Sequence, residues 1–309
     1  MEQTRLDLAT YMSGSISRIM ANAYKNVLSN PREAKFAFRM QQLFAKSEKR
    51  RKKVQEKEGI DVPPFLISSI STTCNLHCKG CYARSNGIAN DQEAERKATM
   101  TPQQWQQIFT EAADMGINFS LLAGGEPMMR KDILEAVAEV KDMIFPIFTN
   151  GTLIGPSYIE FLRKHLNMVP IISIEGTAMG TDERRGQGVF KRTMQSMELL
   201  KQEDLFFGTS ITVTTENYQM VTSSEFIDRL RSYGCKIVFY IEYVPTEAGT
   251  EHLAFIDEHV AEMGVRQALQ SPLFRKIRAA RALGWEHTGG CTLFEHREEI
   301  EEMISPCLS

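Results

Sequence analysis

Three cysteines fall within eight residues of one short stretch of the chain. The stretch reads CNLHCKGCY over residues 74–82 and carries the thiols of Cys74, Cys78 and Cys81. Thiolates are soft ligands that hold zinc or iron–sulfur clusters. A structural zinc site takes four ligands, so three cysteines leave one position open. An iron–sulfur cluster with one open iron could use that position to bind a small molecule, as catalytic metals do.

Other residues could in principle supply a fourth protein ligand. His77 lies inside the stretch, but its neighbours already occupy the short arc around a metal. Cys235 comes just before an apolar run and should face the opposite end of the fold. Cys291 and Cys307 are remote in the chain and remain open, either as ligands or as ordinary thiols. The N-terminus has no apolar signal core, so a disulfide framework is not expected.

Short apolar runs alternate with amphipathic runs from residue 65 onward. The apolar runs predict strands at 65–71, 117–124, 145–151, 169–176, 206–214 and 236–245. The amphipathic runs predict helices at 101–116, 131–143, 156–167, 192–202 and 223–234. Near-continuous apolar strands separated by helices are typical of a parallel sheet. We therefore expect an α/β fold, a partial (β/α)6 TIM-like barrel, with a doubly wound open sheet as the alternative.

Each unusual polar cluster lies at or just beyond the carboxyl end of an expected strand. The cysteine stretch follows the first strand, and the later clusters are GGEP (124–127), TNG (149–151), SIEG (173–176), TVTTEN (212–217) and EYVPTE (242–247). Parallel α/β folds build their sites at that edge. The sequence therefore places one site at the carboxyl edge of the sheet.

The C-x3-C-x2-C spacing after the first strand, together with GGEP after the second, resembles the radical S-adenosylmethionine (SAM) superfamily. In that family the amino and carboxylate groups of SAM chelate the fourth iron of a [4Fe–4S] cluster. The resemblance implies that the three thiols of the stretch hold such a cluster. It also implies that Gly124, Gly125 and Glu126 receive the methionine ammonium of SAM. A cation needs acceptors, and glycines allow close approach to the backbone.

Further cofactor contacts come from the same resemblance. Ser173 and Arg185 resemble the serine and arginine that bind the carboxylate or ribose of SAM in peptide-modifying members. An arginine suits a carboxylate because its fork of donors is bidentate. Arg184 is adjacent, so the arginine assignment could be off by one.

Several weaker candidates lie at the same edge. Asn150 and Glu175 could contact ribose or substrate, although Asn-Gly also simply makes turns. Ile211, Val213 and Val244 could flank the adenine or belong to the barrel core.

The function that the resemblance implies is a radical SAM enzyme. Its reduced cluster cleaves SAM to a 5′-deoxyadenosyl radical, which takes hydrogen from a substrate: a peptide, a cofactor precursor or a lipid precursor. A reductase or a flavodoxin- or ferredoxin-type donor would supply the electron. No residue is singled out for a catalytic role on the substrate. The alternatives are a non-enzymatic zinc or iron–sulfur protein that binds a partner, and a degenerate barrel that keeps only its cluster.

The chain divides into three expected parts: an N-terminal helical extension (1–60), the barrel (61–248) and a C-terminal helical remnant (249–309). Motifs of the barrel resemble an uncharacterised group that carries a cysteine-rich C-terminal region of SPASM or twitch type. RQALQSPLFRKIR (266–278) resembles part of such a region, so either the chain is a naturally shortened member or part of the sequence is missing. Only two cysteines follow residue 246, so we expect one cluster and disfavour an auxiliary cluster held by Cys291 and Cys307.

Composition adds few constraints. The chain has 309 residues and a net charge of −3, so no nucleic-acid partner is expected. No apolar run approaches the length needed to cross a bilayer, and we expect a cytoplasmic protein. The stretch 34–59 predicts a helix with a basic second half. Such a helix could touch a membrane, but we expect it to pack its apolar face on the barrel.

Overall fold

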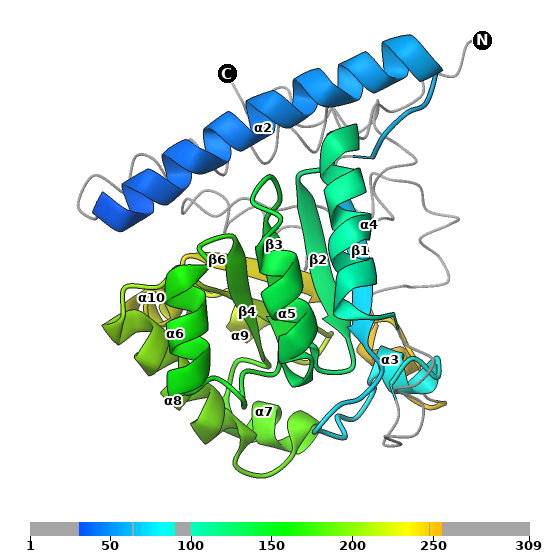
Figure 1. Cartoon of the computed structure of the whole chain (residues 1–309). Coiled ribbons are helices and arrows are strands. Elements are labelled where there is room, and N and C mark those ends of the chain that lie inside the picture. The colour runs from blue at the N-terminus through cyan, green and yellow to red at the C-terminus, as the bar shows by residue number, and fades with distance from the viewer. Residues whose placement is uncertain (1–30, 64, 90–99, 247, 255–309) are drawn as a thin grey trace, which may run out of the picture.

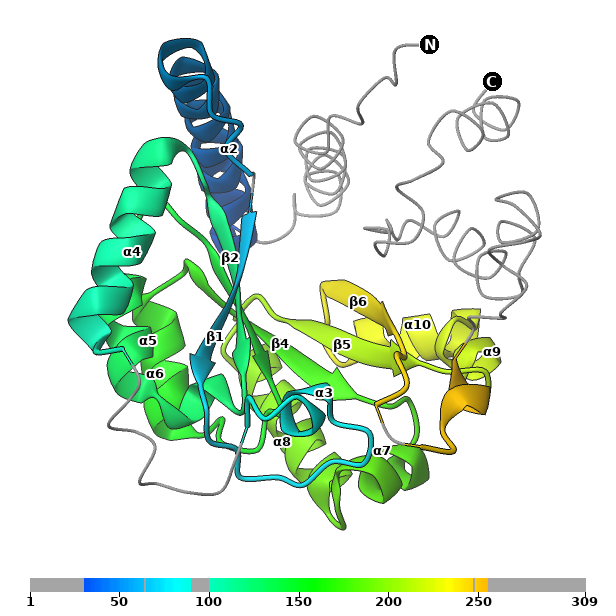
Figure 2. The same cartoon turned by 90° about the vertical axis from the view of Figure 1, so that its right-hand side faces the viewer.

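The computed structural model describes residues 31–63, 65–89, 100–246 and 248–254. Within them, six parallel strands form one sheet in the order β1-β2-β3-β4-β5-β6. The strands are β1 (Phe65–Ser71), β2 (Phe119–Gly124), β3 (Phe145–Thr149), β4 (Met168–Ile174), β5 (Gly208–Val213) and β6 (Ile237–Glu242). The strand order follows the chain without a reversal, as in a barrel and unlike a doubly wound sheet. Figure 2 shows the sheet curled into an open half-barrel, which confirms the expected partial (β/α)6 fold.

Helices connect successive strands and cover the outer face of the sheet (Figure 1). The longer ones are α4 (Pro102–Met115), α5 (Lys131–Ala138), α6 (Pro156–Lys164), α8 (Val189–Gln202) and α10 (Ser224–Ser232). The short ones are α3 (Tyr82–Ser85), η2 (Pro127–Met129), α7 (Ala178–Arg185), α9 (Tyr218–Val221) and η3 (Glu251–Leu253). All five helices expected between strands are present, and the short helices, of which α7 is the longest, are additions.

The start of α4 illustrates why these boundaries follow from the sequence. The side chain of Thr101 accepts a hydrogen bond from the backbone N–H of Gln104. The side chain of Gln104 in turn accepts one from the backbone N–H of Thr101. This reciprocal capping box satisfies backbone donors that a helix start leaves free. Pro102 then occupies the first turn, where a missing N–H costs nothing.

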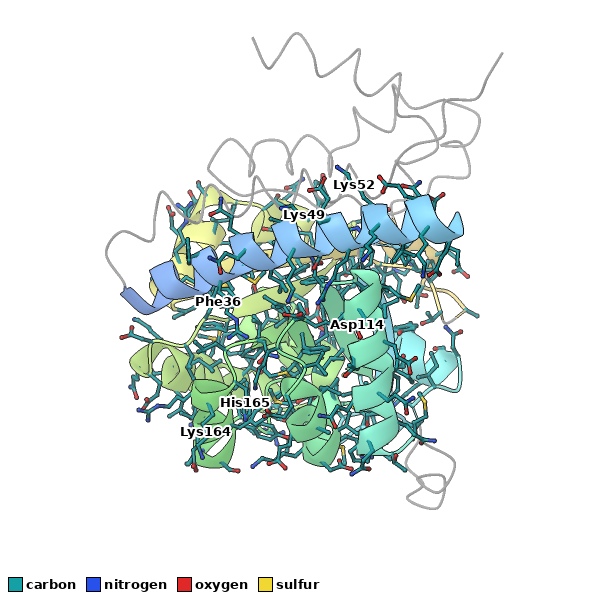
Figure 3. All side chains as sticks on the ribbon, turned by 45° about the horizontal axis from the view of Figure 1, so that its top comes forward. Phe36, Lys49, Lys52, Asp114, Lys164 and His165 are labelled. Atoms are coloured by element: carbon teal, nitrogen blue, oxygen red, sulfur yellow. The ribbon has the colours of Figure 1, made fainter. Side chains whose placement is uncertain are left out.

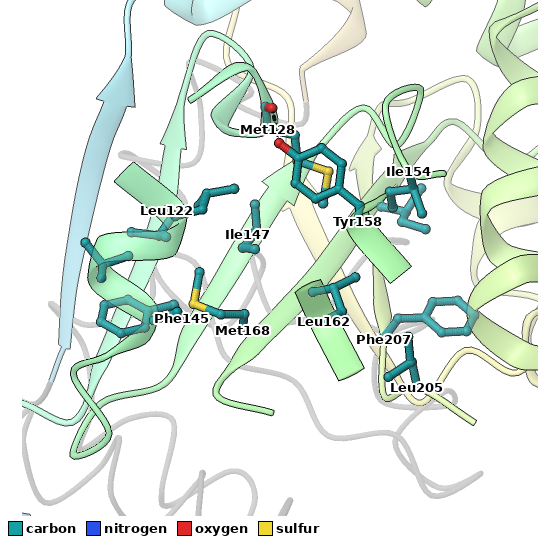
Figure 4. Close-up of a cluster of buried hydrophobic side chains, with 14 of the residues drawn as sticks. Leu122, Met128, Phe145, Ile147, Ile154, Tyr158, Leu162, Met168, Leu205 and Phe207 are labelled. Carbon is teal, nitrogen blue, oxygen red and sulfur yellow. Dashed lines mark hydrogen bonds between the residues drawn. The ribbon is translucent and has the colours of Figure 1, made fainter. Parts of the chain in front are cut away.

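The main core lies between the sheet and its outer helices. Leu122 and Ile147 point outward from β2 and β3 and are fully buried, as are Phe109 and Ile133 of the covering helices. Figure 4 shows part of this cluster, including the hydroxyl of Tyr158, which donates to the carbonyl of Met128. That bond ties α6 to the turn that follows β2.

The helix α2 (Pro31–Glu58) lies across the end of the half-barrel where the strands begin, opposite α3 and α7 (Figures 1 and 2). Met40 and Leu43 of α2 are buried against Ile144, Val169 and Ile171. This second apolar cluster closes the amino end of the half-barrel, and it confirms that the helix expected at 34–59 packs its apolar face on the sheet.

Part of the basic run of α2 also serves this packing. Lys46 and Arg50 form ion pairs with Asp142, at 2.6 and 3.0 Å. The buried guanidinium of Arg51 donates to the carbonyl of Gly116 at the end of α4. Lys52, labelled in Figure 3, remains exposed. Among the described residues, no helix combines the length and the apolar character that crossing a membrane requires.

The packing of α2 predicts a measurable loss of stability. Leu43→Ala should lower the free energy of unfolding by about 2–3 kcal/mol, because it removes buried methyl groups from the seam between α2 and the sheet. Phe38 lies on the same helix and is 52% exposed, so Phe38→Ala is the matched control and should change that free energy by less than about 0.5 kcal/mol. Urea unfolding measures both. Equal effects would mean that α2 is not held through this seam.

Candidate functional site

The cysteine loop begins where β1 ends. Its first residues are hydrogen-bonded to the turn that follows β2. The backbone N–H of Gly125 donates to the carbonyl of Ser71 at 2.7 Å, and that of Glu126 donates to Thr73 at 2.8 Å. A Cβ atom on Gly124 would lie 2.3 Å from the Ser71 oxygen, and one on Gly125 would lie 2.2 Å from the Thr73 oxygen. The two glycines are therefore required by the close approach of two chain segments, whatever else they contact.

The three thiols of the loop are free and half-buried. Burial raises the pKa of the Cys74 thiol to about 11. Burial also raises the pKa of Cys78, while the guanidinium groups of Arg185 and Arg184 oppose that rise. A metal ligand must be the thiolate. The thiols of Cys74 and Cys78 therefore need a positively charged partner, such as a metal, to be deprotonated and act as ligands.

The donor set of the loop bears on the choice between zinc and a cluster. A structural zinc site takes four ligands, and the loop offers three cysteine thiols. An iron–sulfur cluster binds each thiolate through a different iron and can keep one iron open. Three thiols therefore fit a cluster with an open iron better than a structural zinc ion.

Side chains from distant elements hold the loop. The amide of Asn150, after β3, donates to the side chain of Asn75 at 2.8 Å, and Asn75 donates to Thr152 at 2.9 Å. Arg84 donates to the carbonyl of Leu76. Asn150 thus contacts the cysteine loop directly, in a role that its turn position alone did not predict.

Aromatic packing from β6 holds the other half of the loop. The ring of Tyr243, directly after β6, is buried against Gly80. A Cβ on Gly80 would lie 2.9 Å from the Tyr243 hydroxyl oxygen, and the residue has a φ of +62°. Both conditions select glycine between Cys78 and Cys81.

Glu126 lies at the centre of a buried hydrogen-bond network. Its Oε1 accepts from the N–H of Met128 and the hydroxyl of Thr149, and its Oε2 accepts from the N–H of Asn150. The residue is 1% exposed. Burial raises the pKa of Glu126, and the three donors oppose that rise. An ionised carboxylate offers about four acceptor sites, so about one remains for any ligand. The carboxylate therefore joins the turns after β2 and β3.

A second charged group follows β4. Glu175 is 6% exposed, and its Oε1 pairs with Arg184 at 2.6 Å and with Arg185 at 2.6 Å. Ser173 shares a hydrogen bond of 2.9 Å with Ser210 on β5. Both arginines interact with Cys78, so this positive group stands beside the loop.

The remaining predicted residues lie apart from this group. Ile211 and Val213 belong to the core under the outer helices, so they cannot flank an adenine, and that interpretation is wrong. Val244 follows β6 and is 62% exposed. Cys235 is buried at the start of β6, at the opposite edge from the loop. Cys291 and Cys307 lie outside the described residues.

Sequence patterns did not predict several contacts within the site. Asn75, Thr149, Thr212 and Tyr243 make contacts that no motif indicated, because each partner comes from another loop. Their positions at the carboxyl ends of strands were the available signal.

Comparisons with known proteins agree with this arrangement. The family model described as "Radical SAM superfamily" matches residues 68–227, more than half of the chain. An AdoMet-dependent heme synthase of Methanosarcina barkeri (strain Fusaro / DSM 804) is 29% identical over 195 residues, which are 62% of this chain and 54% of that protein. The sporulation killing factor maturation protein SkfB of Bacillus subtilis (strain 168) is 26% identical over 73% of this chain and 53% of its own.

A solved structure supports the fold. Streptococcus suis SuiB, bound to the precursor peptide SuiA, superposes with a TM-score of 0.59 at 20% identity, over 82% of this chain and 55% of that chain. The chain thus spans about half the length of the curated relatives it matches. The cofactors of the matched family are a [4Fe–4S] cluster and SAM. The chain belongs to the radical SAM superfamily.

Proposed function

We propose that the chain is a radical SAM enzyme whose cluster is held by Cys74, Cys78 and Cys81. The observation that carries the proposal is the fixed cysteine loop at the carboxyl edge, bonded to the turn that contains Gly124, Gly125 and Glu126. When bound at a reduced cluster, SAM supplies a 5′-deoxyadenosyl radical.

The residues of the chain have distinct tasks in this proposal. The three thiols bind the cluster and leave one iron for SAM. Arg185 places a cation beside them, where a carboxylate of SAM could pair with it. Glu126 fixes the turn after β2, whose backbone faces the same edge. Asn150, Ser173, Glu175 and Val244 remain candidate contacts of ribose, adenine or substrate.

We further propose a peptide as substrate. The relative SkfB is named a maturation protein, and SuiB was solved with a precursor peptide. The inner face of the half-barrel has suitable chemistry. Ile67 and Ile241 are exposed there at 66% and 45%, and Phe148 packs edge-on against Phe239. Glu242 is the only charged residue in the six strands, and it ends β6. This mostly apolar inner face favours an uncharged side chain of a peptide over a substrate with several negative charges.

The setting of the reaction follows from the same chemistry. A reductase or a flavodoxin- or ferredoxin-type protein would deliver the electron. Free thiols and a reducible cluster require a reducing compartment, so we propose the cytoplasm. We propose that the cysteine loop holds one cluster, with residues 1–60 as a helical extension, 61–248 as the barrel and 249–309 as a C-terminal helical region.

The experiment is anaerobic reconstitution of the full chain, followed by dithionite and SAM. We expect a brown protein with about four irons per chain that releases 5′-deoxyadenosine. A colourless protein with one zinc would favour the binding-protein alternative. A brown protein that never cleaves SAM would favour the degenerate barrel. About eight irons per chain would overturn the single-cluster proposal.

A further inference from the structure

The last turn of α7 contacts the cysteine loop between two of its thiols. Lys79 lies between Cys78 and Cys81. Its backbone N–H donates to the carbonyl of Arg184 at 2.8 Å. In return, Nε of Arg184 donates to the carbonyl of Lys79 at 3.3 Å. The two residues are 105 positions apart in the chain, and they bind each other in both directions.

The same arginine is anchored at its other end. Its Nη1 donates to Oε1 of Glu175 at 2.6 Å and to the hydroxyl of Thr212 at 2.8 Å. Glu175 follows β4 and Thr212 belongs to β5. Arg184 therefore joins the loop to the carboxyl ends of two strands, and its side chain is only 23% exposed.

Its neighbour Arg185 makes a different set of contacts. Nε and Nη2 of Arg185 both donate to Oε1 of Glu175, at 2.9 and 2.6 Å. The side-chain hydrogen bonds of Arg185 end on this carboxylate, whereas those of Arg184 continue to the loop. Both arginines thus carry a positive charge and pair with Glu175, but only Arg184 also binds Lys79.

We propose that Arg184 is a positioning residue that holds the Cys78–Cys81 part of the loop in place before a cluster is bound. The proposal rests on the proposed function only in treating this loop as the cluster site. A guanidinium is suited to the task, because its rigid fork can donate to several acceptors at once. Loops that are held by few contacts open readily, so removal of this anchor should show as local opening.

The test is hydrogen–deuterium exchange on the full chain without iron. In Arg184→Ala the amide of Lys79 should exchange about tenfold faster or more than in the unaltered protein, because the loop loses its charged anchor. Arg185→Ala is the matched control, since it removes a cation from the same carboxylate but no bond to the loop. We expect it to leave exchange at Lys79 within about twofold. Peptides from β3 report global unfolding and should exchange alike in all three proteins.

A second readout separates positioning from general stability. After anaerobic reconstitution, Arg184→Ala should lose iron to a chelator several times faster than Arg185→Ala, and Arg184→Lys should restore only part of the difference. If Arg184→Ala fails to fold, Thr212→Val tests the same anchor and should raise exchange at Lys79 to a smaller extent. Equal exchange at Lys79 in the Arg184 and Arg185 variants would overturn the proposal. A chain that takes up no iron would contradict the proposed function, while the iron-free exchange would still decide the role of Arg184.

Discussion

Glu126→Gln is expected to lower the free energy of unfolding of the iron-free protein by about 2–4 kcal/mol. The carboxylate accepts from two backbone N–H groups and one hydroxyl in a site that is 1% exposed. A glutamine of the same shape replaces one acceptor oxygen with an NH2 donor. That donor must face the N–H of Met128 or of Asn150, so one buried backbone group loses its partner.

The measurement is urea unfolding of protein without iron or SAM, so that no ligand contributes. Glu135→Gln is the matched control, because Glu135 is exposed on α5. It removes one negative charge but no buried hydrogen bonds, and it should lower the free energy of unfolding by less than about 0.5 kcal/mol. The alternative is that Glu126 acts mainly on the ammonium of SAM. Unchanged stability of Glu126→Gln together with weakened SAM binding would support that alternative and contradict the structural role.

Replacing any one of Cys74, Cys78 and Cys81 with alanine should abolish the cluster and the release of 5′-deoxyadenosine. In the proposed site the three thiols would hold one cluster and leave a position for SAM, so each thiol is needed. No other described cysteine can substitute, because Cys235 is buried at the opposite edge. Iron content, visible absorption and product release measure the effect on reconstituted protein.

Cys235→Ala is the matched control for these variants. It removes a thiol that hydrogen bonds to Thr209 and to the carbonyl of Ile237, far from the loop. We expect some loss of stability but full iron content and full cleavage of SAM. If one of the three loop variants kept its iron and its activity while Cys235→Ala lost both, the ligand assignment would be wrong.

Local patterns predicted most of the fold. The six apolar runs became the six strands, because Val, Ile and Phe favour strands and their outward-facing side chains pack under the covering helices. The helix α7 was missed, since its sequence AMGTDERR buries only Thr181 and shows no apolar period. The helix α5 ends at Ala138 rather than at residue 143. Val140 and Met143 are buried but lie in the turns that lead into β3.

The site was predictable in its location but not in its contacts. Parallel strands bring their carboxyl ends to one edge, so the motifs were bound to meet there. Which side chains would bind each other depends on loops far apart in the chain. Glu126 bonds to Asn150 across 24 positions, and Arg184 bonds to Lys79 across 105. From the sequence, Glu126 was expected to bind SAM. In the structure its carboxylate already accepts three hydrogen bonds from other residues of the chain.

The most direct test of the account is the electron paramagnetic resonance spectrum of the reduced, reconstituted chain, recorded with and without SAM. We expect the signal of one reduced [4Fe–4S] cluster, with g-values that shift when SAM binds to its open iron. A cluster signal that SAM leaves unaltered, or a protein that takes up zinc and gives no signal, would contradict the claim that three thiols hold a cluster whose fourth iron serves SAM.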